Sequence, residues 1–95
     1  MERAEISRHE VQVFAVLARK PAAWLSNADI AAELDDVAPR TVRQHTRRLV
    51  KLGLVEQREV FPAHRFRLAE KARQRNGGYL DRLNGAAEAL GIPLP

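Results

Sequence analysis

Cysteine is absent from the chain, which excludes disulfide bridges, a thiolate nucleophile and any zinc site with a thiolate ligand. Aromatic residues make up only 5% of the sequence, and glycine and proline number five each, so the composition fits neither a low-complexity nor a fully disordered chain. Hydrophobic residues still reach 45% of 95 residues, enough for one modest core. We therefore expect a single domain over residues 1–95.

Long apolar runs are also missing. No stretch reaches the length of a membrane span, and residues 1–5 are not followed by the apolar segment of a signal peptide. We expect a cytoplasmic protein without a membrane-spanning segment.

Residues for metal binding or catalysis do not assemble along the sequence. His9, His45 and His64 fall in three separate segments without paired ligand spacing, and no Ser-His-Asp set, phosphate-binding loop or paired carboxylate with a pocket is found. The sequence predicts no metal, no cofactor and no enzymatic activity.

Positive charge is concentrated in one segment. The chain carries a net charge of +4, and between Arg40 and Arg67 there are eight Lys or Arg residues against two acids. A basic stretch of this kind favours a polyanionic partner, although a run of arginines alone is usually a solvated helix face.

The first half of the chain predicts two helices. Ser7 and Glu10 have the spacing of a capping box, and apolar residues follow at helical spacing until Pro21, which predicts a helix over Arg8–Arg19. Ser26 is expected to cap a second helix over residues 27–34, followed by a turn at residues 35–38.

A third helix is predicted to open at Pro39 and to end at Leu52-Gly53, because proline suits the first helical position and glycine the end. Its inward positions are Val42, Thr46 and Leu49. The opposite face is then basic and polar, with Arg and Gln side chains suited to base edges.

After Gly53 the apolar period changes toward two, which predicts a hairpin with strands over residues 55–60 and 64–68 and a turn at 61–63. Alternation places Phe66 and Leu68 inward and the neighbouring arginines outward.

From Ala69 the pattern is helical again, with a possible break at residues 76–78. One apolar stripe has two interpretations, core cover or a dimer interface, and we favour the dimer, with residues 69–95 as a C-terminal helical dimerisation extension. The stripe consists of Tyr79, Leu83, Ala86, Ala87 and Leu90.

The predicted order is thus helix-helix-helix-hairpin-helix, a mainly α fold with a small β-hairpin. Two short helices joined by a tight turn and followed by a basic hairpin are a device for placing one helix in the major groove. The candidate DNA-binding residues are Arg40, Thr41, Arg43, Gln44, Arg47, Arg48 and Lys51 on the third helix and Arg58, His64, Arg65 and Arg67 on the hairpin. Arg43 and Gln44 are the candidate base readers, and Arg48 and Lys51 the candidate phosphate contacts.

The stretch from Asn27 to Val55 resembles the winged helix-turn-helix families of bacterial regulators, including the MarR and ArsR proteins. Its most specific part is the closing Leu-x-x-Leu-Gly-Leu-Val at residues 49–55, and the resemblance covers about residues 7–69. Ala38 stands where these families usually place a Ser or Thr cap, and Thr46 where an aliphatic residue is usual. The cysteine metal site of ArsR proteins is absent, and the chain is short for the effector pocket of MarR proteins.

We accordingly expect a homodimeric, sequence-specific regulator that binds double-stranded DNA at a palindromic site, with repression as the expected sign. Two alternatives stay open. One is a plasmid or phage accessory DNA-binding factor, and the other is a winged helix that serves as a protein–protein interaction module.

Overall fold

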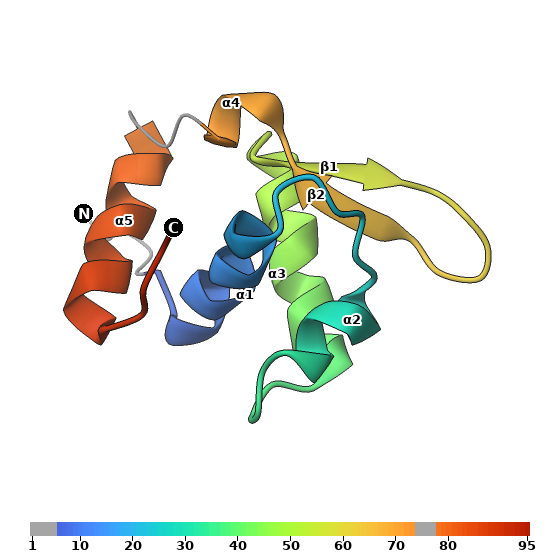
Figure 1. Cartoon of the computed structure of the whole chain (residues 1–95), viewed down its shortest axis with the longest axis horizontal. Coiled ribbons are helices and arrows are strands. Elements are labelled where there is room, and N and C mark those ends of the chain that lie inside the picture. The colour runs from blue at the N-terminus through green and yellow to red at the C-terminus, as the bar shows by residue number, and fades with distance from the viewer. Residues whose placement is uncertain (1–5, 74–77) are drawn as a thin grey trace.

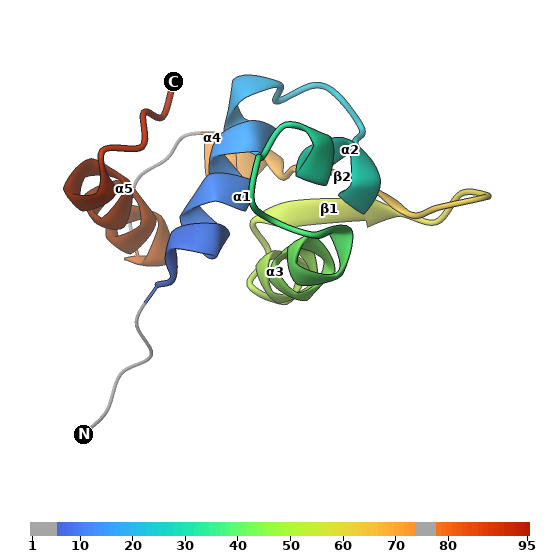
Figure 2. The ribbon, with the colours of Figure 1, turned by 90° about the horizontal axis from the view of Figure 1, so that it is seen from below.

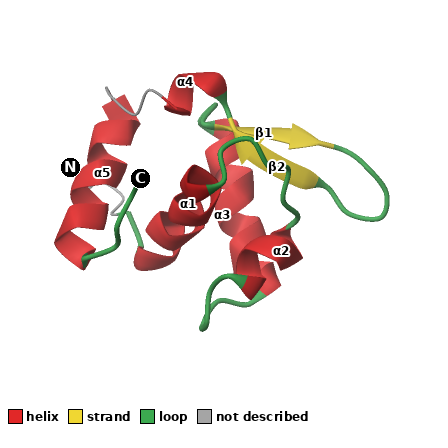
Figure 3. Cartoon of the chain, in the orientation of Figure 1, coloured by secondary structure: helices red, strands yellow, loops and turns green. Residues whose placement is uncertain are grey.

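A computed structural model describes residues 6–73 and 78–95. Its elements run in the predicted order, with one additional short helix after the hairpin (Figures 1 and 3). They are α1 (Arg8–Arg19), α2 (Asn27–Ala32), α3 (Pro39–Lys51), β1 (Val55–Arg58), β2 (Arg65–Leu68), α4 (Glu70–Arg73) and α5 (Gly78–Leu90). The predicted break falls partly outside the described residues, and α5 begins at its last position, Gly78.

Helix α1 is the centre of the core, and its predicted bounds are confirmed. Ser7 Oγ accepts a hydrogen bond from the Glu10 backbone N–H at 3.1 Å, which caps the helix. The reciprocal half of the predicted capping box is wrong, because the Glu10 carboxylate bonds to Tyr79 and pairs with Arg48 instead. Val11, Phe14 and Leu17 are fully buried, since α2, α3 and α5 surround this helix.

Helix α2 carries the reciprocal capping pair that α1 lacks. Ser26 Oγ accepts from the Asp29 N–H, and Asp29 Oδ2 accepts from the Ser26 N–H, both at 3.0 Å. The helix ends at Ala32, two residues before the predicted Leu34, because Glu33 already adopts the cap geometry.

Helix α3 begins with Pro39 as predicted, and Ala38 provides no side-chain cap. Val42, Thr46 and Leu49 are fully buried, which confirms the predicted inward face. The Thr46 hydroxyl lies 2.9 Å from Asn27 Oδ1 and 3.1 Å from the Arg43 carbonyl oxygen, so its burial leaves no unpaired polar group. The helix ends at Lys51, and Gly53 follows with φ of 78°, a conformation that favours glycine.

Strands β1 and β2 form an antiparallel hairpin in which Val55 pairs with Leu68 and Arg58 with Arg65. Both strands are shorter than predicted at the turn end. Leu25 adds one bridge to β2, in which the Leu25 N–H donates to the Phe66 carbonyl at 2.9 Å and the Leu25 carbonyl accepts from the Phe66 N–H at 2.8 Å. Phe66 and Leu68 are buried as predicted, and the loop between the strands projects away from the helices (Figure 2).

Helix α5 lies against α1 on the side of the molecule opposite the hairpin loop (Figures 1 and 2). Leu80, Leu83 and Ala87 are buried in this contact, while Tyr79 and Leu90 are half-buried beside it. Part of the predicted apolar stripe therefore covers the core of a single chain. Among the described residues, no helix has the length and apolar character required to cross a bilayer.

Candidate nucleic-acid interface

The outer face of α3 presents a row of basic and polar side chains and no acid. Arg40, Arg43, Gln44 and Arg47 are exposed and follow helical spacing, opposite the buried face of the same helix. Thr41 is half-buried beside this row, and Lys51 is exposed in the last turn. The burial of one face by Val42, Thr46 and Leu49 thus fixes which side chains face solvent.

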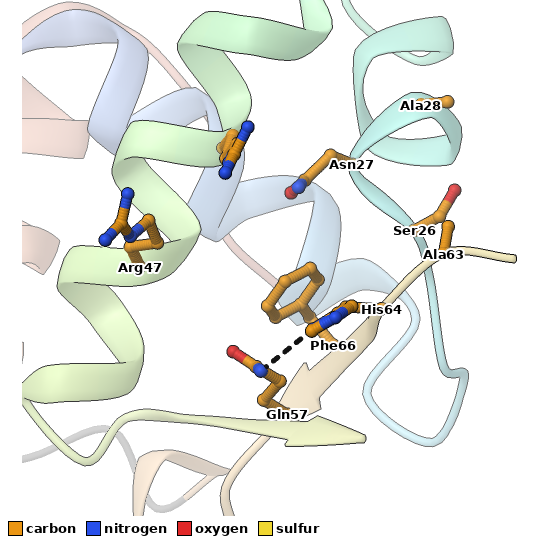
Figure 4. Close-up of a pocket in the computed structure, with 9 residues that line it drawn as sticks. Ser26, Asn27, Ala28, Arg47, Gln57, Ala63, His64 and Phe66 are labelled. Atoms are coloured by element: carbon orange, nitrogen blue, oxygen red, sulfur yellow. Dashed lines mark hydrogen bonds between the residues drawn. The ribbon is translucent and has the colours of Figure 1, made fainter. Parts of the chain in front are cut away.

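An open groove of about 470 Å³ runs between α3 and the hairpin (Figure 4). Arg43 and Arg47 of α3 lie on one side, and Gln57 and His64 of the hairpin lie on the other. The remaining lining residues are Ser26, Asn27, Ala28, Ala63 and Phe66. The groove therefore has cationic groups along its helical side and the Gln57 amide and His64 imidazole along its hairpin side.

Gln57 is one of the groove residues that the sequence interpretation missed, and it is the one on β1. Its Nε2 lies 3.0 Å from His64 Nδ1, so the two side chains join the hairpin strands at the groove (Figure 4). Alternation along β1 contains the signal that identifies it, because Gln57 lies on the same strand face as the buried Val55.

The hairpin arginines lie on the other strand face and are engaged with the chain itself. Trp24 has the Arg58 guanidinium 4.5 Å and the Arg67 guanidinium 4.3 Å from its ring centroid. Arg67 also pairs with Glu56 at 2.9 Å, and Arg65 lies 3.8 Å from the Asp29 carboxylate. Of the predicted hairpin contacts, only His64 lines the groove, whereas the three arginines surround it from the opposite face.

Arg48, a predicted phosphate contact, is directed toward α5. Its Nε lies 3.6 Å from Glu10 Oε1, and its guanidinium lies 5.8 Å from the Tyr79 ring centroid. The Tyr79 hydroxyl donates to Glu10 Oε2, and burial raises the pKa of this phenol, with the hydrogen bond to Glu10 raising it further. Glu10 is only 3% exposed, so this cluster joins α1, α3 and α5 through a buried carboxylate.

The histidines are divided between two places. His9 and His45 lie edge to face, with ring centroids 6.4 Å apart, and burial lowers the pKa of His45. His64 belongs to the hairpin groove instead. Within residues 6–73 and 78–95, no three His, Asp or Glu side chains are grouped as metal ligands.

Several solved structures are similar to this chain, among them the following three. A mutant of Lactococcus lactis ZitR matches with a TM-score of 0.62 and 17% identity, over 95% of this chain and 58% of that one. A possible HxlR family transcriptional factor from Thermoplasma volcanium GSS1 matches with a TM-score of 0.64 and 16% identity, over 90% of this chain and 73% of that one. SSV1 F-93 matches with a TM-score of 0.57 and 19% identity, over 95% and 97%.

The chain has a winged helix fold. At sequence identities below 20%, the similarity to these structures shows the fold alone. The chain spans little more than half the length of ZitR. No protein-family model matches the sequence, and no curated protein matches it. In the terms of this fold, α2 and α3 form the helix-turn-helix, and β1 and β2 form the wing.

Proposed function

We propose that this winged helix binds duplex DNA in a sequence-specific manner and regulates transcription, with α3 in the major groove. The observation that carries the proposal is the exposed cationic row of α3, which continues into the groove beside the wing. An α-helix fits the width of the major groove, and Arg and Gln side chains form paired hydrogen bonds with guanine and adenine edges. The fold is also found in the Thermoplasma volcanium protein described as a possible transcriptional factor.

Within this proposal the α3 residues divide into two roles. Arg43 and Gln44 read base edges, because they are exposed on the outward face. Lys51 contacts a phosphate from the last turn of α3. Arg48 is proposed to contact a phosphate as well, while it remains paired with Glu10 of α1 and beside the Tyr79 ring of α5.

The groove itself suits one sugar-phosphate strand. When α3 occupies the major groove, the adjacent wing crosses the neighbouring backbone, and the groove between the two elements faces that backbone. Arg47 supplies positive charge there, and Gln57 and His64 supply hydrogen-bonding groups. The wing arginines then add positive potential from the far strand face.

We further propose that the protein acts as a homodimer on a palindromic site and represses by occupying its operator. One α3 reads too few base pairs for tight specific binding, whereas two-fold pairing places two such helices about 34 Å apart, one duplex turn. Repression requires only occupancy, and no cofactor is needed for it.

The deciding experiment is a selection of bound sequences from a random duplex library at near-physiological salt, followed by titration of the enriched duplex. A palindromic consensus supports the dimeric regulator. Salt-sensitive binding without a consensus favours the accessory DNA-binding factor, and no binding favours the protein-interaction module. A contact with several phosphates gives a log–log salt slope near −0.9 per phosphate.

A matched pair of variants separates the α3 face from net charge. Arg47→Gln removes one charge from the groove, and Arg19→Gln removes one charge beside Pro93 and Leu94, outside that groove. We expect Arg47→Gln to weaken binding and Arg19→Gln to leave it nearly unchanged. Equal losses from both variants would show that binding depends on net charge rather than on this face.

A further inference from the structure

The loop at the tip of the wing is apolar, whereas the other exposed side chains of the hairpin are polar or charged. Residues 60–63 are Val-Phe-Pro-Ala, and no Lys or Arg lies between Arg58 and Arg65. Phe61 is 96% exposed, whereas Leu52, the other large apolar side chain exposed among the described residues, is 37% exposed. A single exposed apolar residue is ordinary on a protein surface, so its position decides whether it has a role.

Phe61 lies on the part of the chain that extends farthest from the helices. The loop that carries it projects beyond both strands in the two perpendicular views (Figures 1 and 2). Ala63 and His64, two and three residues further along, line the groove between α3 and the wing. The apolar tip therefore begins where the groove ends.

The hairpin beneath the tip is tied to the body through one strand face, where the Trp24 ring contacts Arg58 and Arg67. On the groove face the Gln57–His64 hydrogen bond joins the two strands to each other. Arg65 is also paired with Asp29 of α2. Such attachments hold the tip in one direction relative to α3, which a side chain that enters a groove requires.

The reach of the loop is set by the residues between Phe61 and the groove. Ala63 lines the groove, and the two residues from it to Phe61 extend at most about 7 Å. The minor groove is about 6 Å wide and lies directly beyond one backbone strand of the major groove. With α3 in the major groove and one backbone strand between α3 and the wing, the tip comes to the edge of the adjacent minor groove.

We propose that Phe61 is an apolar wedge that enters this minor groove and partly unstacks one base step. Phenylalanine and proline are among the side chains that proteins insert between base steps, bending the duplex toward the major groove. Glu59 near the tip opposes attraction to phosphates, so the contact that the tip offers is apolar. The inference rests on the proposed DNA binding. It assigns the bending of the duplex beside the binding site to Phe61.

The test uses the duplex enriched by selection, with 2-aminopurine placed in turn at the steps flanking each half-site. The full-length wild-type protein should raise the fluorescence at one flanking step, because unstacking relieves quenching. Phe61→Ala should lose that signal and bind about tenfold more weakly, while its salt slope stays unchanged because no charge is removed. Phe61→Leu, which keeps an apolar wedge, should retain most of both, and Leu52→Ala is the matched apolar control.

Each other outcome overturns the inference or the function on which it rests. If wild type binds the duplex and Phe61→Ala gives the same affinity and the same fluorescence, the wedge is wrong while DNA binding stands. If wild type binds no duplex, the proposed function fails first. If Phe61→Ala converts a dimer into a monomer in sedimentation, the tip belongs to an interface between copies of the chain, and the wedge is also wrong.

Discussion

At the scale of single residues, the buried Glu10 carboxylate of α1 connects this helix to α3 and α5. It accepts a hydrogen bond from the Tyr79 hydroxyl of α5 and lies near Arg48 of α3. A buried acceptor that loses its donor keeps its desolvation cost, so removal of one partner is more destabilising than the mean value of a hydrogen bond.

Tyr79→Phe tests this dependence because it removes one oxygen and keeps the ring. We expect the free energy of unfolding to fall by about 1–3 kcal/mol. Urea denaturation of Tyr79→Phe, Glu10→Gln and the double variant gives the coupling between the two residues. A coupling of zero would mean that the hydrogen bond does not stabilise the fold.

His45 makes stability depend on pH. Burial lowers its pKa below the ordinary value of 6.5, the nearby Glu10 opposes this shift, and His9 and Arg48 add to it. The unfolded chain therefore takes up the proton first as the pH falls, so the stabilising contribution is present above pH 6.5 and is lost below it. We expect His45→Gln to flatten the dependence of unfolding free energy on pH between about 5 and 7.

The measurement for His45 is a series of urea titrations across that pH range. An unchanged slope in His45→Gln would assign the pH dependence to another group.

The residue contacts that the sequence failed to predict are those between distant segments. Ser7 and Glu10 have a capping spacing, and half of that prediction is confirmed because it depends on neighbours along the chain. The partner of the Glu10 carboxylate is 69 positions away, at Tyr79, and no local pattern announces it. The Trp24 contacts with two wing arginines are of the same kind.

At the scale of elements, α3 is the helix whose two ends should differ in their effect on DNA. For Arg43→Ala we expect relaxed sequence preference, with about 1–3 kcal/mol of discrimination lost at one base pair. For Lys51→Ala we expect nearly uniform weakening on all sequences and a salt slope smaller by about 0.9. Titrations of the enriched duplex and its single-base variants at several salt concentrations measure both quantities.

The same titrations can contradict the assignment of Arg43 as a base reader. If Arg43→Ala loses the same affinity on every duplex, Arg43 is a phosphate contact. Replacing a base reader weakens binding only to duplexes that carry the base it recognises. The location of Arg43 beside the groove makes that outcome informative about how α3 enters the duplex.

The wing depends on Trp24, which comes from the link between α1 and α2. Loss of two cation–π contacts in Trp24→Ala should cost about 1–2 kcal/mol in total. The strand amides of β1 and β2 should then exchange faster with solvent than in wild type, as measured by hydrogen exchange. Trp24→Phe keeps a ring, so its amide exchange rates should lie between those of wild type and Trp24→Ala. Unaltered exchange in Trp24→Ala would show that the contacts of Trp24 with the arginines do not hold the wing.

Element ends were predictable where one residue type decides them. Pro39 begins α3 because N–H groups in the first turn have no acceptor within the helix, so the missing N–H of proline costs nothing there. Gly53 adopts a positive φ after the helix. The wing strands were predicted too long, since the predicted first strand runs to Val60, next to the turn at residues 61–63, whereas the pairing stops at Arg58. Pro62 has no N–H to offer a strand ladder, and the apolar tip finds no core to cover.

At the scale of the whole molecule, α5 has an inner and an outer face. Leu83 and Ala87 are buried against the core of the same chain, whereas Gly85 and Ala89 are exposed on the outer side. Tyr79, Ala86 and Leu90 lie at the margin, half-buried. The homodimer that we propose therefore uses the margin and the outer side, and small residues there permit close approach of two helices.

Gly85→Arg tests this interface without disturbing the core, because open space surrounds the position where a side chain begins. Replacing a mid-helix glycine also favours the helix, by about 0.5–1 kcal/mol. We expect Gly85→Arg to be at least as stable as wild type but monomeric in sedimentation equilibrium, and Gly85→Ala to remain dimeric. Leu83→Ala should instead lower the free energy of unfolding by about 2–5 kcal/mol, as a buried packing residue does.

DNA binding completes the test, because the affinities of a dimer and a monomer differ most on a palindromic duplex. Gly85→Arg should lose affinity for the full site yet bind an isolated half-site like wild type, since each α3 still reads its own half. Equal mass and equal palindrome affinity for Gly85→Arg and wild type would remove α5 from the interface. A wild-type protein that is monomeric both free and on its selected duplex would refute the homodimer, and the single winged helix would then have to find its site with α3 and the wing alone.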